Sequence, residues 1–258
     1  MLFGIGIVYV FKIVVAPIYA LVYSKPLVNH FYVFPKKLEA QHKEWISNHF
    51  AFYKRLSPKK QRYFDHRVLN FIKHTPFVSR ENIEITFEMK LLVASTSTML
   101  TFGMQRYLYS VIDAIIIYPS SFQGAASDNF HAGEFNPKHK VIVFSWDNFY
   151  KGIKISDNNL NLGIHEFSHA LLFESARKKG YGSTSNSIFS DYYTEISNDL
   201  KKPEILQSYI ESSYFRDYAY LNSVEFIAVI LEHFFETPSE FEARFPELYG
   251  KVKKMINF

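Results

Sequence analysis

The sequence predicts a helix-rich α+β fold with one small sheet, preceded by a hydrophobic N-terminal helix. Apolar residues recur at helical spacing in most segments from residue 38 onward, and only the stretches 114–118 and 140–145 are typical of strands. Residues 1–23 are apolar apart from Lys12. With 48% apolar residues among 258, the chain has ample material for a buried core.

Composition excludes several classes of protein. The chain has no cysteine, so the fold depends on no disulfide and contains no cysteine-rich zinc site. The net charge of +4 is too small to indicate a nucleic-acid partner. No internal repeat or low-complexity run is present. A repeat protein and a nucleic-acid-binding protein are therefore not expected.

Residues 1–24 are predicted to form a membrane anchor. An apolar stretch of about 20 residues can span a bilayer as a helix, and the apolar residues offset the cost of Lys12. The basic residues that follow the stretch are Lys25, Lys36, Lys37 and Lys43. By the positive-inside rule, we expect a single pass of the inner membrane with the rest of the protein in the cytoplasm. The alternative is a hydrophobic helix that docks on the domain or lies in the membrane interface.

Residues 25–56 are predicted to be a connector and a first helix, 38–56, and residues 57–258 to form the main domain. Ser57 and Pro58 are a typical cap and first residue for a helix over 58–74. Further helices are expected at 88–102, within 188–211 and at 238–256. The strand at 140–145 is expected to pair with one near 131–135, across a turn that contains Asn136 and Pro137.

The segment 161–172 contains the motif H-E-x-x-H, from His165 to His169. Its apolar spacing predicts a helix, with Asp157 as the N-cap. On a helix the two histidines share one face, so both can bind a single Zn²⁺ ion. Glu166 would then accept a proton from a water whose pKa the metal lowers. The alternative is a chance match, which occurs in on the order of a few per hundred chains of this composition.

A catalytic zinc normally takes three protein ligands, and the best candidate for the third is Glu225. It lies near the start of a second apolar helix, 222–236, where a buried carboxylate needs a cation or hydrogen bonds. Glu232 shares the same face, as a hydrogen-bond acceptor for a ligand histidine or as an alternative ligand. His233 is a weaker rival for either place. The alternative is that both glutamates are exposed positions of an amphipathic helix.

Several segments accompany the H-E-x-x-H motif. A pattern runs from Tyr218 through Asn222 and Glu225 to Glu232, and shorter segments occur at 90–103, 116–119, 141–146 and 244–249. Together they resemble the Mlc titration factor A family of zinc peptidases, over about residues 57–250 and in the same order. One position departs from the family, which commonly carries Asp three residues after the second histidine, where this chain has Leu172.

The resemblance implies that the main domain is a zincin-like metallopeptidase domain of the gluzincin type. It implies one Zn²⁺ per chain with His165, His169 and Glu225 as ligands. It further implies Glu166 as the general base and Tyr218 as a hydrogen-bond donor to the oxyanion. Family members hydrolyse short peptide substrates, and one binds a sugar-responsive transcriptional repressor. A peptide or protein substrate and a transcriptional regulator are therefore the implied partners.

In zincin-like sites an edge strand often runs beside the motif helix and pairs with an extended substrate. The candidate for this role is the strand made of Val141, Ile142, Val143, Phe144 and Ser145. An ordinary structural hairpin explains the same residues equally well.

Two functions from different classes remain open at this point. The first is a membrane-tethered zinc peptidase that acts on cytoplasmic peptides or unfolded segments. The second is a regulatory protein that sequesters a transcription factor at the membrane, with a zinc site that is mainly structural. The glutamate within the motif disfavours the second function, because a structural site has no use for a base.

Overall fold

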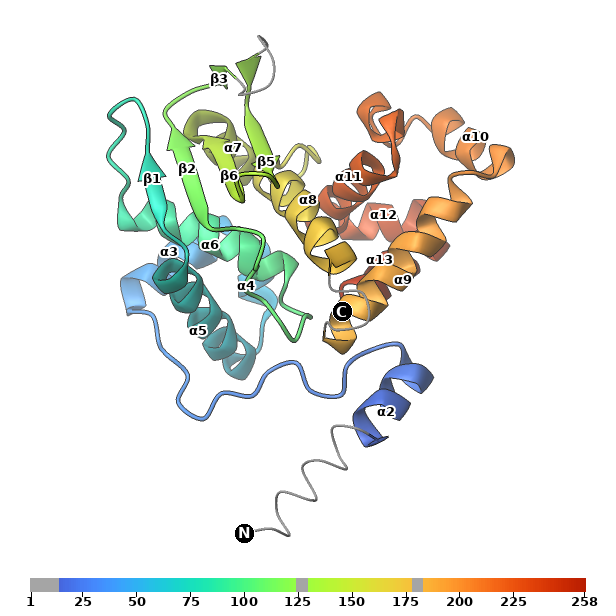
Figure 1. Ribbon diagram of the computed structural model, residues 1–258, viewed down its shortest axis with the longest axis horizontal. Helices are drawn as coiled ribbons and strands as arrows, with labels where there is room; N and C mark the ends of the chain where they lie inside the picture. Colours follow the sequence, from blue (N-terminus) through green and yellow to red (C-terminus); the bar gives the residue numbers. More distant parts are fainter. Residues whose placement is uncertain (1–13, 124–129, 178–182) are drawn as a thin grey trace.

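A computed structural model describes residues 14–123, 130–177 and 183–258. It confirms the helix-rich α+β fold. Figure 1 shows a four-stranded sheet on one side of helix α8 (Leu162–Arg177) and the C-terminal helices on its other side. Helix α8 packs against both parts and carries the H-E-x-x-H motif, so the motif lies at the centre of the domain.

The main sheet has the strand order β1-β2-β6-β5. Its strands are β1 (Phe77–Ser79), β2 (Ala114–Tyr118), β5 (Gly133–Asn136) and β6 (Val141–Ser145). β1, β2 and β6 are parallel, and β5 pairs antiparallel with β6. The expected strands at 114–118 and 140–145 and the expected partner near 131–135 are thus confirmed. A second, two-stranded sheet pairs β3 (Phe122–Gln123) with β4 (Phe130–His131).

The prediction that residues 141–145 form an edge strand is wrong. β6 lies between β2 and β5, so its backbone groups form hydrogen bonds on both sides and cannot also pair with a substrate. The run from Val141 to Phe144 is continuously apolar, which is typical of a central strand with both faces covered. The edge strand on this side of the sheet is β5.

The helices that precede β2 are α2 (Ala16–Tyr23), α3 (Ala40–His49), α4 (Ala51–Arg55), α5 (Pro58–His74) and α6 (Phe87–Leu100). The helix expected at 38–56 is interrupted at Phe50, whose backbone is extended. Ile46, Phe50 and Tyr53 from this region join the same buried core as the main domain. α5 has the expected bounds, and the side chain of Ser57 caps it by accepting a hydrogen bond from the backbone N–H of Lys60.

The later helices are α7 (Trp146–Lys154), α8, α9 (Thr184–Asp199), α10 (Pro203–Glu211), the 3₁₀ helix η2 (Asp217–Leu221), α11 (Ser223–Glu236), α12 (Pro238–Arg244) and α13 (Pro246–Met255). The helix expected at 238–256 is divided because Pro246 begins a new helix. α7, which was not expected from the sequence, is capped at its N-terminus by the hydroxyl of Ser145.

Residues 1–13 of the expected membrane anchor lie outside the described residues, and α2 forms most of the remainder. Within the described part of the chain, no helix is both long and apolar enough to cross a bilayer. The anchor therefore stays a prediction from the sequence.

A fully buried arginine in α5, Arg67, holds the connector between α2 and α3 against the domain. Its guanidinium donates to the backbone oxygen of Asn29 at 2.8 Å and to the hydroxyl of Tyr32 at 2.7 Å. It also donates to the backbone oxygens of Thr101, Phe102 and Met104. A buried cation is stable only when its donors are satisfied, so these contacts fix the connector, α5 and the end of α6 together.

We expect Arg67→Met to lower the free energy of unfolding by about 3 kcal/mol or more, because it leaves several buried carbonyl groups without donors. Urea unfolding of the full chain in mild detergent measures this loss. The control is Arg244→Met, which removes an exposed ion pair with Glu240 and should cost less than about 1 kcal/mol. Equal losses in the two variants would contradict the role given to Arg67.

Candidate metal centre

The helix that carries the motif, α8, begins directly after Asn161. The side-chain oxygen of Asn161 accepts a hydrogen bond from the backbone N–H of Ile164 at 3.0 Å, so Asn161 is the N-cap. The expectation that Asp157 caps this helix is wrong, because the helix starts later. The side-chain amide of Asn161 also donates to the backbone oxygen of Gly152 and to Glu236. The first turn of α8 is thereby fixed to α7 and α11.

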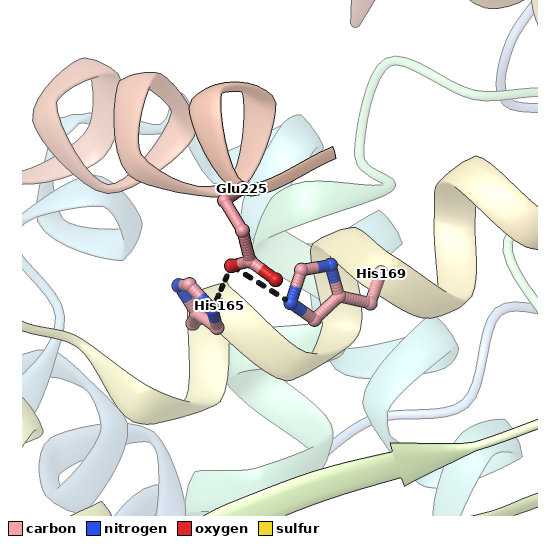
Figure 2. Close-up of side chains that lie close together, drawn as sticks. All are labelled: His165, His169 and Glu225. Carbon is pink, nitrogen blue, oxygen red and sulfur yellow. Dashed lines mark ion pairs between the residues drawn. The ribbon is translucent and has the colours of Figure 1, made fainter. Parts of the chain in front are cut away.

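Glu225 occupies the first turn of α11. The side-chain oxygen of Asn222 caps this helix by accepting hydrogen bonds from the backbone N–H groups of Val224 and Glu225, at 2.9 and 3.0 Å. Tyr218 lies before the cap, in η2, so Tyr218 and Glu225 do not share one continuous helix. The cap sets where α11 begins and so directs the carboxylate of Glu225 toward α8 (Figure 2).

Figure 2 shows that His165, His169 and Glu225 converge. Oε2 of Glu225 lies 3.1 Å from Nε2 of His165 and 3.5 Å from Nε2 of His169. Ligand atoms about 2.0–2.1 Å from a tetrahedral zinc lie roughly 3.3 Å apart, so both distances fit a shared ion. One ligand atom from each residue lies within 4.8 Å of the other two, which makes this group a possible metal site.

The carboxylate of Glu225 supports the fit to a metal. With both imidazoles neutral, its buried Oε2 atom accepts no well-aligned hydrogen bond from any residue that the structure describes. A buried carboxylate oxygen without a donor is costly, and a cation among the three ligand atoms would satisfy it. The two imidazole nitrogens and one carboxylate oxygen are also a ligand set that zinc commonly takes in catalytic sites.

Glu232 orients His165. The Oε1 atom of Glu232 lies 2.8 Å from Nδ1 of His165, and both side chains are buried. Nδ1–H therefore donates to Glu232, which leaves Nε2 directed at Glu225 and able to bind a metal once it has lost its proton. Two further groups hold the Glu232 carboxylate: the guanidinium of Arg216 donates to Oε1 at 2.6 Å, and the backbone N–H of Asn161 donates to Oε2 at 2.8 Å. Glu232 thus contacts the candidate ligand His165 and is not one of the three residues whose atoms could share a metal ion.

These carboxylates change the pKa of the histidine between them. Burial lowers the pKa of His165, but Glu225 and Glu232 outweigh burial and raise this pKa to about 9. In the absence of a metal, the imidazole of His165 therefore carries a proton on each ring nitrogen at neutral pH, and the proton on Nε2 stands where a metal would bind. Because metals bind only the neutral imidazole, loading the site must release that proton, and metal affinity must fall as the pH is lowered.

Glu166 lies between the motif helix and the edge strand β5. Its Oε2 atom accepts a hydrogen bond from the backbone N–H of Phe135 at 2.8 Å. Burial raises the pKa of Glu166, and the neighbouring His165 and His169 oppose that rise. A glycine permits the close contact between helix and strand, since a Cβ atom on Gly133 would lie only 3.1 Å from Cγ of Glu166.

A cavity of about 380 Å³ opens beside Glu166. Tyr218 lines it, with its ring centroid 5.8 Å from that of His165. Burial and the nearby carboxylate of Glu225 raise the pKa of Tyr218, so the phenol keeps its proton and can donate it in a hydrogen bond. The other polar side chains that line the cavity are Asn148, Lys151, Asn158, Asn161, Arg216 and Glu232.

The structure also shows where His233 lies, the residue that was a rival for the place of Glu225 or Glu232. His233 is buried on the far side of α11 against the rings of Tyr214 and Phe215, where burial lowers its pKa to about 4. It does not reach the site. Arg216 was not expected at the site, although a carboxylate such as Glu232 inside an apolar helix indicates that a cation lies nearby.

We expect Glu232→Gln to weaken zinc binding by about 10- to 100-fold, because the ligand histidine loses a charged acceptor. Competition with a chromophoric chelator measures this affinity. The matched control is Glu240→Gln, which changes an exposed carboxylate outside the site. If both variants bound zinc as tightly as the unmodified protein, the role assigned to Glu232 would be wrong.

Comparisons with known proteins place this chain in a family. Residues 29–256 match the model of the glucose-regulated metallo-peptidase M90 family. An uncharacterized protein of Synechocystis sp. is 22% identical over 243 residues, which cover 86% of this chain and 85% of that protein. The family match spans most of the chain and confirms the resemblance found in the sequence. The chain belongs to the glucose-regulated metallo-peptidase M90 family.

Proposed function

We propose that this protein is a zinc-dependent peptidase tethered to a membrane by its N-terminal segment. The observation that supports this proposal most strongly is the convergence of two imidazoles from α8 and one carboxylate from α11 beside a buried glutamate. Membership of a metallopeptidase family supports the same class of reaction. A purely structural metal site would need neither the glutamate nor the adjoining cavity.

Each side chain has a distinct part in peptide hydrolysis. A bound zinc ion would polarise the scissile carbonyl group and lower the pKa of the attacking water. Glu166 accepts the proton of that water and returns it to the leaving amine. The raised pKa of Glu166 favours this transfer. Tyr218 donates a hydrogen bond to the oxygen on which negative charge develops. Glu232 and Arg216 hold the ring of His165 in place throughout.

The substrate backbone pairs with β5 in this proposal. The backbone oxygen of Ala132 accepts a hydrogen bond from Ser145 N–H and so points toward β6. By the alternation of strand residues, the backbone groups of Gly133 and Phe135 point away from β6, toward the motif helix. Because the Phe135 N–H already donates to Glu166, the groups left for a substrate are those of Gly133 and the backbone oxygen of Phe135. Gly133 also lines the cavity. An extended peptide laid along this edge would bring its carbonyl group next to Glu166 and the ligand residues.

We expect Glu166→Gln to keep its zinc and to lose peptide hydrolysis by about 10²- to 10⁴-fold, because the amide cannot accept the proton. Hydrolysis of an unstructured fluorogenic peptide, measured beside the zinc content of the same preparation, tests this. The control is Glu195→Gln, which alters a half-exposed carboxylate paired with Lys251. Full hydrolysis by zinc-loaded Glu166→Gln would show that another group is the base.

The proposed tether rests on the apolar composition of residues 1–24 and on the lysines that follow. A reporter fused after residue 258 tests its orientation. We expect a cytoplasmic signal from a fluorescent reporter and no activity from a phosphatase that folds only outside the cytoplasm. The opposite pattern would contradict the proposed topology.

A further inference from the structure

The connector between α2 and α3 displays large apolar side chains to solvent. Phe31, Val33 and Phe34 are 81%, 68% and 90% exposed. Single exposed apolar residues are common on soluble proteins, but three within four positions form a patch that calls for a partner. Val28 and the α2 residues Ile18 and Val22 are exposed as well, so the patch continues toward the N-terminal apolar stretch.

Contacts with the domain hold the backbone of this connector in place. The exposed apolar side chains therefore project from a fixed segment of the chain. Arg67 binds the backbone oxygen of Asn29 and the hydroxyl of Tyr32. The ring of His30 stacks on that of Tyr63, with centroids 5.1 Å apart. The backbone N–H of Lys36 donates to His66 at 3.0 Å. These contacts anchor the connector on both sides of the exposed residues.

The anchored and exposed side chains alternate along the connector. His30 and Tyr32 face the domain, whereas Phe31 and Val33 face solvent. This alternation is that of an extended chain with one face packed and one face free. Folding Phe31 inward would remove groups that satisfy the buried cation of Arg67, so the domain keeps the aromatic face outward.

Charge indicates what the patch contacts. The connector, residues 24–37, contains Lys25, Lys36 and Lys37 and no acidic residue, and the first acidic residue of the chain is Glu39. Burial lowers the pKa of His30 to about 3, so this histidine is neutral and the lysines supply the positive charge. Exposed aromatic residues flanked by lysines suit the headgroup region of a membrane with anionic lipids.

We propose that the connector is a membrane-interface loop. Phe31, Val33 and Phe34 enter the headgroup region of an anionic bilayer, and the flanking lysines contact lipid phosphates. Lipid insertion, unlike a protein interface, needs no complementary shape. The loop therefore fixes how the domain sits on the membrane. This inference goes beyond a flexible tether and does not depend on peptidase activity.

The position of the connector in the fold determines which part of the domain would face the membrane. Figure 1 shows the connector and α2 at one end of the molecule and β3 with the start of β5 at the opposite end. A domain seated on the connector would hold the edge strand β5 away from the bilayer. Peptides would then reach the cavity from the aqueous side.

The test uses the full chain reconstituted in vesicles whose lipids carry bromine on their acyl chains, a quencher of tryptophan. We expect Phe34→Trp to show blue-shifted emission and to lose about half of its added fluorescence when the vesicles contain phosphatidylglycerol, with a smaller loss in phosphatidylcholine alone. The matched control is Phe130→Trp, at a 78% exposed position in β4, which should not be quenched. The unmodified protein gives the background of Trp45 and Trp146.

Two further variants make the test specific. Adding Phe31→Ser to Phe34→Trp should reduce the quenching, and adding Lys36→Gln with Lys37→Gln should remove the preference for phosphatidylglycerol. Circular dichroism of each variant checks that the domain is folded. Equal quenching at positions 34 and 130, or none in either lipid, would overturn the proposal. A blue shift without vesicles that grows with protein concentration would identify a second copy as the partner and would also overturn it.

Discussion

The carboxylate of Glu232 is the contact on which the metal centre depends. It is almost completely buried in α11, and it holds three groups from two other parts of the chain. These are the ring of His165 and the backbone N–H of Asn161, both at the start of α8, and the guanidinium of Arg216 before η2. A buried carboxylate tolerates no loss of these donors, so α8 and α11 can pack in only one register. That register brings His165 and His169 to face Glu225.

The charges around the site explain why a divalent cation suits it. Glu166, Glu225 and Glu232 lie within the same buried region, and Arg216 is the cation that pairs with one of them. Three carboxylates and one guanidinium leave a net charge of −2 when all are ionised, which a Zn²⁺ ion would neutralise. Without the ion, the raised pKa of His165 supplies part of the missing positive charge as a bound proton. Metal binding and protonation of this histidine therefore oppose each other.

Much of the site could be predicted because it depends on residues that lie close together in the sequence. The spacing of His165 and His169 fixes a shared helix face, and the apolar surroundings of Glu225 and Glu232 require partners for buried carboxylates. The edge strand could not be predicted, since the order of strands depends on long-range pairing and β6 differs from β5 only in its apolar run. The pairing of Arg216 with Glu232 was missed for the same reason, because it joins residues that are far apart in the sequence. The cap at Asn161 is local, a hydrogen bond to the N–H of Ile164, and it was missed because Asp157 is also a residue type that caps helices.

The central claim is that Nε2 of His165, Nε2 of His169 and one oxygen of Glu225 bind a single zinc ion and leave a coordination position free. A crystal structure of the zinc-loaded protein, with anomalous difference maps recorded on both sides of the zinc absorption edge, tests this most directly. The account predicts one anomalous peak about 2.0–2.2 Å from each of these three atoms, with a water as the fourth ligand. A peak elsewhere, or a zinc ion whose four positions are all filled by protein, would contradict it.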